Sequence, residues 1–285
     1  MPDFECLIVD DGSSDHHELA RVVSGLNDPR FRIIYQANGG GGSARNAGIN
    51  AAQANYVAFL DSDDYFLPTK LSACRAAIER RPFALENTVL FSQVIVDRGG
   101  TRTWIKPPRA PKDGERVDDY LILRGGFIQT STIVMERSLA AEVRFDPALP
   151  FGQDTDFCVR LAAHGCKFEM LPEPLVIWID SSAPNRVSST RRVDALLHWT
   201  DRVKPLLSDK SFLAYRGWHG AKAALASGHL RLASTLFMKA IVGRAFSPSL
   251  AIKVALQLAV PPQLYRQAAN LVVRLLGKNT KGTSW

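Results

Sequence analysis

The first part of the chain alternates short apolar runs with helical stretches, and this pattern constrains the fold more than any other feature. The predicted strands are residues 5–9, 31–35, 56–60 and 88–96, and the predicted helices between them are residues 16–25, 43–53 and 68–80. Such alternation is typical of α/β proteins, in which crossover helices join parallel strands. The sequence therefore predicts a parallel sheet covered by helices.

The pattern changes after Gly99, where prolines and glycines mark a long connection. Thr130–Met135 is predicted as a strand, a helix opens at Phe151–Phe157, and Lys167–Leu171 and Leu175–Ile179 are predicted as closing strands. From Arg192 onward the sequence is typical of helices interrupted by Gly and Pro. We therefore expect an α/β domain over residues 1–190 and a basic helical region over residues 191–285.

Charge is distributed unevenly along the chain. The net charge is +7, but the residues after Asp209 include eleven Lys or Arg and no Asp or Glu, so the first 209 residues are net negative. A basic surface can face anionic lipid, nucleic acid or an acidic substrate. The basic residues alternate with apolar clusters rather than with the aromatic residues of a single-strand binder, so we expect an anionic membrane surface and no nucleic acid.

The apolar segments are too short for a membrane-spanning helix. A spanning helix needs ~20 apolar residues, and the longest uncharged segment near the end, Val254–Tyr265, contains Pro261 and Pro262. Met1–Glu5 has neither the basic region nor the apolar core of a signal peptide. The four cysteines lie far apart without a C-x-x-C pair, which indicates buried thiols in a reducing compartment. We expect a cytoplasmic protein, peripheral at the inner face of the cell membrane.

Carboxylates gather where two predicted strands end. Asp61, Asp63 and Asp64 follow the strand at 56–60, and Asp10 and Asp11 follow the first strand. Ligands of open α/β sheets bind at the carboxyl ends of strands, and crowded carboxylates repel one another unless a cation neutralises them. Mg²⁺ or Mn²⁺ bound to a diphosphate would suit the acidic turn. The alternative is a solvated turn that caps the next helix.

A glycine-rich stretch, Asn38–Gly48, runs into the helix predicted at residues 43–53. Four consecutive glycines before a helix could present backbone N–H groups to a phosphate, with Arg45 adding positive charge. The spacing matches neither dinucleotide nor P-loop motifs, so a flexible surface loop is the alternative.

Four motifs, taken in order, resemble those of family 2 glycosyltransferases of the GT-A fold. They are Val9–Asp15 (VDDGSSD), Gly42–Ile49 (GSARNAGI), Phe59–Asp64 (FLDSDD) and Phe151–Phe157 (FGQDTDF). The similarity extends over residues 3–180. It implies a Rossmann-like mixed sheet of the nucleotide-diphospho-sugar transferase type, covered by helices and followed by a C-terminal helical region.

The resemblance also implies roles for individual residues. Asp11 matches the aspartate that meets the nucleobase, with Asp10 beside it. The other implied nucleotide-sugar contacts are Arg45, Asp61 and Ser62. Asp63, with Asp61, would hold Mn²⁺ or Mg²⁺. Asp154 matches the general base that removes the acceptor proton in an inverting transfer.

The chain departs from the family pattern in three places. The family begins with a strand, a Pro-Thr-Tyr-Asn-like turn and a helix that are not found before Cys6. We therefore expect either a start codon placed too late or an N-terminally incomplete catalytic domain. Gln153 stands where relatives often have Glu, and Trp178–Asp180 stands where many have a metal-binding histidine, which Asp180 could replace.

The leading hypothesis is a metal-dependent, hexosyl-type transferase. It would move a sugar from a nucleotide-diphosphate donor to a hydroxyl of a lipid-linked glycan, as in exopolysaccharide or O-antigen synthesis. The alternatives are a catalytically impaired sugar-nucleotide-binding or scaffold relative, and a nucleotidyltransferase, which would need more lysine near the glycines. The basic helices could equally pack on the catalytic domain or mediate self-association.

Overall fold

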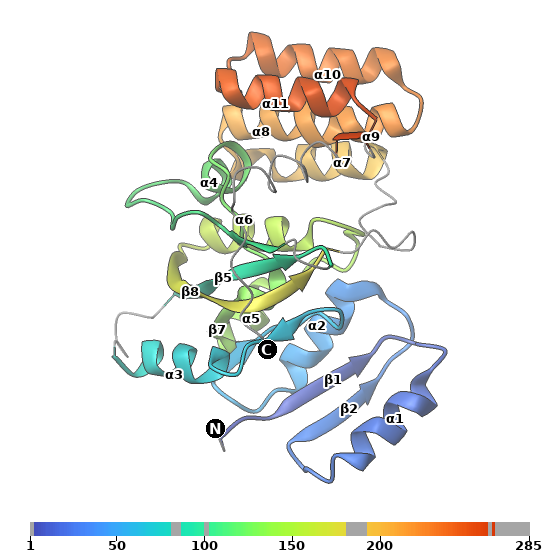
Figure 1. Ribbon diagram of the computed structural model, residues 1–285, viewed down its shortest axis with the longest axis vertical. Helices are drawn as coiled ribbons and strands as arrows, with labels where there is room; N and C mark the ends of the chain where they lie inside the picture. The colour runs from blue at the N-terminus through green and yellow to red at the C-terminus, as the bar shows by residue number, and fades with distance from the viewer. Residues whose placement is uncertain (1–2, 81–86, 100–102, 181–192, 262–263, 266–285) are drawn as a thin grey trace.

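The computed structural model describes residues 3–80, 87–99, 103–180, 193–261 and 264–265 (Figure 1). The strands are β1 (Cys6–Asp10), β2 (Phe31–Tyr35), β3 (Tyr56–Ala58), β4 (Tyr65–Phe66), β5 (Thr88–Asp97), β6 (Thr103–Lys106), β7 (Val134–Glu136) and β8 (Lys167–Ile179). The helices of the first 180 residues are α1 (His16–Gly25), α2 (Gly40–Ala51), α3 (Lys70–Arg80), α4 (Val117–Leu123), the 3₁₀ turn η1 (Thr130–Thr132), α5 (Arg137–Val143) and α6 (Gln153–Ala163).

The remaining described residues are helical. They form α7 (Val193–Val203), the 3₁₀ turn η3 (Lys204–Leu206), α8 (Asp209–Tyr215), the π-helical turn η4 (Arg216–Gly220), α9 (Ala221–Ala226), α10 (Leu230–Val242) and α11 (Pro248–Ala259). Figure 1 shows these helices at one end of the molecule and β1, β2 and α1 at the other, with the larger sheet between them. The predicted boundary between residues 190 and 191 lies outside the described residues.

The strands form two sheets. β1 and β2 pair in parallel, and a six-stranded sheet has the order β3-β7-β5-β8-β4, with β6 on β5. Only the β5–β8 pairing of the larger sheet is parallel. The predicted mixed α/β fold is confirmed. The expectation of one parallel sheet is wrong, because among the described strands β1 and β2 pair only with each other and most pairings of the larger sheet are antiparallel.

Several predicted boundaries shift for identifiable reasons. The strand predicted at 130–135 is instead η1 followed by β7, and the helix predicted at 43–53 begins at Gly40. The two closing strands are one continuous strand, β8, because an irregularity opposite Gln93 accommodates Pro172 and Pro174 without ending the pairing. The short strands β4 and β6 carry no apolar run long enough to predict them.

Alternating side chains of β1 and β2 face different helices. Ile8 pairs with Ile33, which lines a hollow under α1, whereas the neighbouring Val9 lies on the α2 side, 3.6 Å from the position of a Cβ on Gly48. The polar end of β1 is thereby held beside the first turn of α2.

An aromatic cluster fixes the ends of two elements that carry acidic residues. The rings of Phe145 and Phe157 stack at 4.1 Å, and Phe59 packs edge-on against Phe145 at 5.2 Å. Each buried phenylalanine stabilises the fold by about 1.5–3 kcal/mol. Phe59 lies two residues before Asp61 and Phe157 three residues after Asp154, so this cluster holds both carboxylates near one another.

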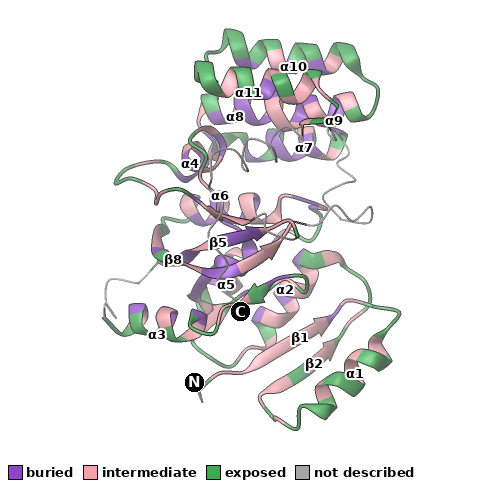
Figure 2. Ribbon diagram, in the orientation of Figure 1, coloured by how far each residue is buried: buried purple, intermediate pink, exposed green. Residues whose placement is uncertain are grey.

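The helices after residue 192 pack on the sheet domain through a continuous apolar cluster. Leu196, Trp199 and Ala214 from the helical end join Val159 of α6 and Phe151, which lies just before α6, in that cluster. Figure 2 shows buried residues on the inner side of these helices and exposed residues on the outer surface of α10. Packing on the catalytic domain, one alternative raised by the sequence, is thus observed.

Close packing at Gly217 predicts a measurable loss of stability on substitution. A Cβ at Gly217 would lie 2.4 Å from the Cβ of Ala240, so we expect Gly217→Ala to lower the free energy of unfolding by about 1–3 kcal/mol through overpacking. Urea denaturation measures this change. Gly25→Ala is the matched control, because a Cβ there meets no atom within 4 Å. Equal unfolding midpoints for the two variants would contradict the packing argument.

Candidate functional site

The acidic turn after β3 separates its carboxylates by burial. Asp61 is partly exposed, Ser62 and Asp63 are exposed, and Asp64 is buried. The predicted helix cap is wrong for Asp64, because α3 begins six residues later at Lys70. The three carboxylates of this turn therefore have different surroundings and cannot share one role.

Asp64 anchors the turn to η1. Its Oδ2 accepts hydrogen bonds from Gln129 Nε2 at 2.5 Å and Ser131 Oγ at 2.6 Å. The Ser131 hydroxyl also accepts the backbone N–H of Asp61 at 2.9 Å. Burial raises the pKa of Asp64, and the bonds from Ser131 and Gln129 oppose that rise. The buried Lys70 ammonium donates to the Thr132 carbonyl at 2.8 Å and so holds η1 from the other side.

Removing the Ser131 hydroxyl tests this anchoring. We expect Ser131→Ala to destabilise the fold by about 1–3 kcal/mol, because the Asp64 carboxylate and the Asp61 N–H each lose a partner in a buried setting. Chemical denaturation measures the loss. Ser72→Ala removes an exposed hydroxyl that donates to the carbonyl of Thr69, just before its own helix, and we expect a change within about 0.5 kcal/mol. A Ser131→Ala variant as stable as Ser72→Ala would show that the anchoring is weak.

Arg45 joins three elements at the centre of the site. From α2, its guanidinium donates to Asp61 Oδ1 at 2.5 Å and to Gln153 Oε1 at 2.5 Å. Both side chains of the Arg45–Asp61 pair are about one-quarter exposed or less, so the pair is shielded from bulk water without being sealed from a ligand. The arginine thus links the end of β3 to the start of α6.

Asp154, which the family resemblance indicates as the base, and Asp156, two residues further on, have different surroundings in the structure. Asp156 is fully buried and accepts from Trp199 Nε1 at 2.8 Å and from Arg160 Nη2 at 2.6 Å, so it stabilises the packing of α6 against α7. Asp154 is partly exposed and accepts from the backbone N–H of Thr155 at 2.7 Å. Desolvation raises the pKa of Asp154, the negative charge of Asp61 raises it further, and the Arg45 charge lowers it.

The structure brings Asp154, Asp61 and Arg45 into one electrostatic cluster. A carboxylate with a raised pKa, beside a second carboxylate and in reach of solvent, is suited to accept a proton from a bound substrate. The residue before it, Gln153, contacts Arg45 through its neutral amide oxygen. The predicted base and the predicted nucleotide contacts therefore adjoin each other.

Asp10 and Asp11 organise the glycine-rich stretch. Asp11 accepts from Gln36 Nε2 at 2.6 Å and from the backbone N–H groups of Gly39 at 2.8 Å and Gly40 at 2.7 Å. Asp10 Oδ1 accepts from the Ser13 N–H at 2.8 Å, while its Oδ2 is buried without a hydrogen-bond partner among the described residues.

The expectation of a flexible glycine loop is wrong. Gly40–Gly42 form the first turn of α2, and the Asp11 carboxylate already occupies two N–H groups at this end of the helix. Asp11 therefore acts as the anion that this helix end binds. The glycine at 42 is needed because a Cβ there would lie 2.9 Å from the Asp146 carbonyl oxygen.

Metal ligands are few in the described part of the chain. No group of three or more His, Cys, Asp or Glu side chains is placed to hold an ion among these residues. Mg²⁺ is commonly held by one or two carboxylates together with substrate phosphates. Asp63 is exposed on the acidic turn and is suited to such a site. The Asp61 carboxylate already accepts a hydrogen bond from Arg45. Asp180 forms an ion pair with Arg98 at 2.6 Å.

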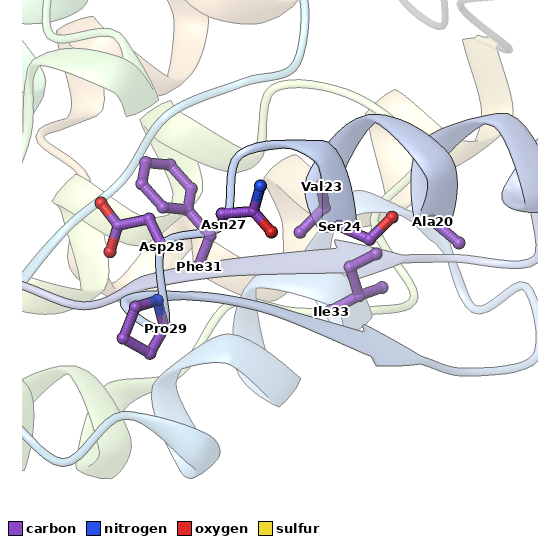
Figure 3. Close-up of a pocket in the computed structure, with 8 residues that line it drawn as sticks. All are labelled: Ala20, Val23, Ser24, Asn27, Asp28, Pro29, Phe31 and Ile33. Atoms are coloured by element: carbon purple, nitrogen blue, oxygen red, sulfur yellow. The ribbon is translucent and has the colours of Figure 1, made fainter.

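A hollow of about 520 Å³ between α1 and β2 lies on the other face of β1 and β2 from α2 (Figure 3). It is lined by Ala20, Val23, Ser24, Asn27, Asp28, Pro29, Phe31 and Ile33. Its carboxylate, Asp28, is paired with Arg30 at 2.5 Å, which lowers the pKa of Asp28 to about 2. Its lining lacks a group suited to proton transfer at neutral pH.

Sequence reasoning missed Gln129, Ser131 and Lys70. These residues lie in or against an irregular segment whose partners are 22 to 67 positions away in the chain. The only local signal was the polar run Gln129–Thr132 in an otherwise apolar region. The cysteines are free thiols, and Cys74, Cys158 and Cys166 are buried as expected.

None of the described helices combines the length and apolarity required to cross a bilayer.

The family described as "Glycosyl transferase family 2" matches residues 1–143. That match includes the acidic turn and Arg45 and ends before Asp154.

Individual relatives agree with the family match. The amylovoran biosynthesis glycosyltransferase AmsB of Erwinia amylovora is 34% identical over 219 residues, which is 75% of this chain and 73% of that protein. The succinoglycan biosynthesis protein ExoO of Rhizobium meliloti is 29% identical over 67% of this chain and 56% of that protein.

A solved structure has the same fold. S. aureus TarS, residues 1–349 in complex with UDP-GlcNAc, superposes with a TM-score of 0.56 at 18% identity, over 97% of this chain and 73% of that one. The mixed sheet, the ordered motifs and these matches agree. The chain belongs to glycosyl transferase family 2, with the GT-A fold.

Proposed function

We propose that this protein is an inverting, metal-dependent glycosyltransferase that moves a sugar from a nucleotide-diphosphate donor to a hydroxyl of a glycan acceptor. The observation that carries the proposal is the cluster of Asp154, Asp61 and Arg45, in which a carboxylate with a raised pKa adjoins the acidic turn. Family membership supports the reaction class, and the polysaccharide biosynthesis relatives support a glycan acceptor.

In the proposed reaction, Asp154 accepts the proton of the acceptor hydroxyl as the oxygen attacks the anomeric carbon. Attack from the face opposite the leaving group inverts the configuration at that carbon. Arg45 orients Asp61 for the donor's nucleotide portion and holds Gln153, so that the donor and the base are positioned by one side chain.

Asp63, with Asp61 nearby, is proposed to hold Mn²⁺ or Mg²⁺ on the donor diphosphate. When bound, the ion would neutralise charge that develops on the leaving diphosphate. The exposed position of Asp63 leaves room for phosphate and water oxygens in the coordination sphere. Asp10, Asp11 and Ser62 are proposed to shape the nucleotide end of this site.

A panel of nucleotide sugars with Mn²⁺, beginning with UDP-GlcNAc, tests the proposal. Wild-type protein is expected to bind at least one donor in a thermal-shift assay and to release its nucleoside diphosphate. A donor at one hundred times its dissociation constant stabilises the fold by about 2.7 kcal/mol. Binding without any release or transfer would favour the alternative, a catalytically impaired sugar-nucleotide-binding relative. Absence of binding across the panel would contradict both.

We further propose a peripheral contact with anionic membranes through the outer side of α10. Met238 and Val242 are exposed there, Val242 by 77%, beside the exposed basic residues Arg231 and Lys239. Exposed apolar and basic side chains on one helix suit an interfacial location. The basic residues beyond residue 265 lie outside the described residues.

Vesicle sedimentation tests this contact. We expect binding to vesicles of phosphatidylglycerol and phosphatidylcholine, little binding to phosphatidylcholine alone, and a loss in Val242→Asp. Val22→Asp on α1 is the control, because Val22 is also exposed. Figure 2 shows α1 at the other end of the molecule from α10. Equal effects of the two substitutions would contradict the proposed surface.

A further inference from the structure

The side-chain amide of Gln153 is held at both ends in one orientation. Its Nε2 donates to the backbone carbonyl of Leu149 at 2.6 Å, and its Oε1 accepts from Arg45 Nη1 at 2.5 Å. A carbonyl can only accept and a guanidinium can only donate, so exchanging the amide nitrogen and oxygen would lose both hydrogen bonds. A glutamate here would turn a carboxylate oxygen toward the Leu149 carbonyl oxygen with no proton between them. The position therefore favours a neutral amide.

The guanidinium of Arg45 is also held from two other directions. Its Nη2 donates to Asp61 Oδ1 at 2.5 Å, and its Cζ lies 5.2 Å from the centroid of the Phe145 ring. A guanidinium has five N–H donors in one plane, so acceptors on both terminal nitrogens fix the orientation of that plane. Among the described residues, only Asp61 and Gln153 accept from Arg45, which leaves further N–H donors for a ligand.

The glycine at position 41 leaves the space in which this contact forms. Gly41 lies four residues before Arg45 on α2, and a Cβ there would lie 3.1 Å from Arg45 Nη1 and 3.4 Å from Gln153 Oε1. Ordinary contact between heavy atoms begins at about 3.5 Å, so an alanine would press on both atoms of the hydrogen bond. Gly41 does not have a positive φ. The space beside the contact, rather than the backbone conformation, therefore requires glycine.

The absence of charge on Gln153 matters because of its neighbours. Gln153 directly precedes Asp154 on α6, and the guanidinium that it holds also forms an ion pair with Asp61. With a neutral amide, the positive charge of Arg45 balances the one carboxylate that it contacts. A carboxylate at position 153 would place a second negative charge on the same guanidinium and would oppose the binding of an anionic ligand.

We propose that Gln153 is a positioning residue that fixes the Arg45 guanidinium beside Asp154 and keeps its surroundings electrically balanced for a nucleoside-diphosphate group. The inference rests on the proposed transfer reaction and adds two residues to it, Gln153 and Gly41. Gln153 sets the direction of the remaining Arg45 N–H donors, and Gly41 provides the room for the contact. Both act through Arg45 rather than on the reacting atoms.

Nucleoside-diphosphate binding in EDTA tests the neutral amide without metal or turnover. Isothermal titration with UDP, GDP, CDP and ADP identifies the nucleotide that wild type binds. We expect Gln153→Glu to weaken this binding about tenfold or more, or ~1.4 kcal/mol. Equal affinity of Gln153→Glu and wild type would overturn the proposal.

Gln257→Glu on α11 is the matched control for the added charge. The amide of Gln257 also accepts and donates, from Trp218 Nε1 at 2.8 Å and to the Tyr265 hydroxyl at 3.1 Å. This variant carries the same added charge away from Arg45 and is expected to bind the nucleotide as wild type does. Equal weakening by the two substitutions would also overturn the proposal, because it would show a general effect of charge.

Two variants that add no charge test the positioning. Gln153→Met removes both hydrogen bonds of the amide, whereas Gly41→Ala keeps every polar group and presses a carbon against Arg45 Nη1. Each is expected to lower kcat about tenfold through misplacement of Arg45. Because both act on one contact, the double variant should be no slower than the slower single variant. Multiplied losses, or full kcat in Gln153→Met, would overturn the positioning role.

Gly48→Ala is the matched control for Gly41→Ala. Gly48 lies on the same helix, and a Cβ there meets the Val9 side chain at an ordinary 3.6 Å. This variant is expected to keep wild-type kcat. Circular dichroism and urea unfolding verify that every variant folds. A loss of kcat in Gly48→Ala equal to that in Gly41→Ala would show that any added methyl group on α2 has the effect, and would overturn the role of Gly41.

The orientation of Arg45 can also be observed without turnover. A guanidinium with both terminal nitrogens hydrogen-bonded rotates slowly and gives separate N–H signals in ¹⁵N NMR, which are assigned to Arg45 by their absence in Arg45→Lys. We expect these signals in wild type and their loss in Gln153→Met and Gly41→Ala. Unchanged Arg45 signals in folded Gln153→Met would overturn the proposal.

These measurements separate the inference from the proposed function. A wild type that binds no nucleotide sugar and no nucleoside diphosphate, but whose Arg45 signals depend on Gln153, would contradict the transferase proposal and leave the positioning of Arg45 standing. A wild type that transfers sugar, with unchanged kcat in folded Gln153→Met and Gly41→Ala, would overturn this inference and leave the transferase proposal standing.

Discussion

Asp154→Asn is expected to reduce kcat by about 10²–10⁴-fold while nucleotide-sugar binding is retained. The amide keeps the size of the carboxyl group but cannot take the acceptor proton. Within the described part of the chain, this carboxylate accepts hydrogen bonds only from the backbone N–H and, at 3.5 Å, the hydroxyl of Thr155, so the substitution should leave the fold intact. Steady-state kinetics with the donor identified by the panel measure the effect.

Asp194→Asn is the matched control for Asp154→Asn. Both carboxylates lie in the first turn of a helix, α7 for Asp194 and α6 for Asp154, but Asp194 is exposed on the helical end of the molecule. The control is expected to retain wild-type kcat. Comparable activity of the two variants would remove Asp154 from the role of base.

The same carboxyl group sets a pH dependence. Desolvation and the Asp61 charge raise the pKa of Asp154 above the ordinary 3.8, and the base works only when deprotonated. The rate should therefore fall as pH falls through this raised pKa, at higher pH than for an ordinary aspartate. The pH–rate profile of Asp154→Asn, measured on its residual activity, should not show this fall of the rate at low pH.

Asp63→Ala is expected to reduce transfer by at least ~10²-fold and to weaken Mn²⁺ binding in the presence of nucleoside diphosphate. The carboxylate is exposed at the acidic turn, so its removal should not cost fold stability, and the loss would be in metal and donor affinity. Electron paramagnetic resonance of Mn²⁺ measures the binding independently of turnover.

A comparison with Asp113→Ala makes the Asp63 result specific. Asp113 is an exposed carboxylate in the connection before α4, and its removal changes the net charge equally. Full activity and unaltered Mn²⁺ affinity in Asp63→Ala would refute a metal role for this residue. Equal weakening in both variants would point to a general electrostatic effect instead.

Much of the site could be anticipated because it is built from local motifs. The acidic turn follows β3 directly, and Arg45 lies on the helix before it, so both could be placed from spacing and from the family resemblance. The contacts that give these residues their properties are not local. Arg45 and Gln153 are 108 positions apart, and Asp64 and Gln129 are 65 apart.

The different burial of Asp154 and Asp156 is another feature that depends on contacts between distant parts of the chain. They lie two residues apart in one helix turn, and without the family resemblance the residue pattern does not distinguish them. In the structure, Asp154 is partly exposed and Asp156 is enclosed by Trp199 and Arg160. Which side of α6 faces α7 depends on packing between helices, and no local pattern encodes it.

By itself, the sequence determined the α/β class, the family and the identity of the carboxylates at the strand ends. The period of the hydrophobic pattern, the turn residues and the order of the motifs are properties of the sequence itself and do not depend on the conformation of the chain. Tertiary structure alone decided that β1 and β2 form a separate sheet, that Asp64 is an anchor and that Arg45 contacts both Asp61 and Gln153. These features depend on long-range pairing, burial and charge proximity, which arise only when distant segments pack together.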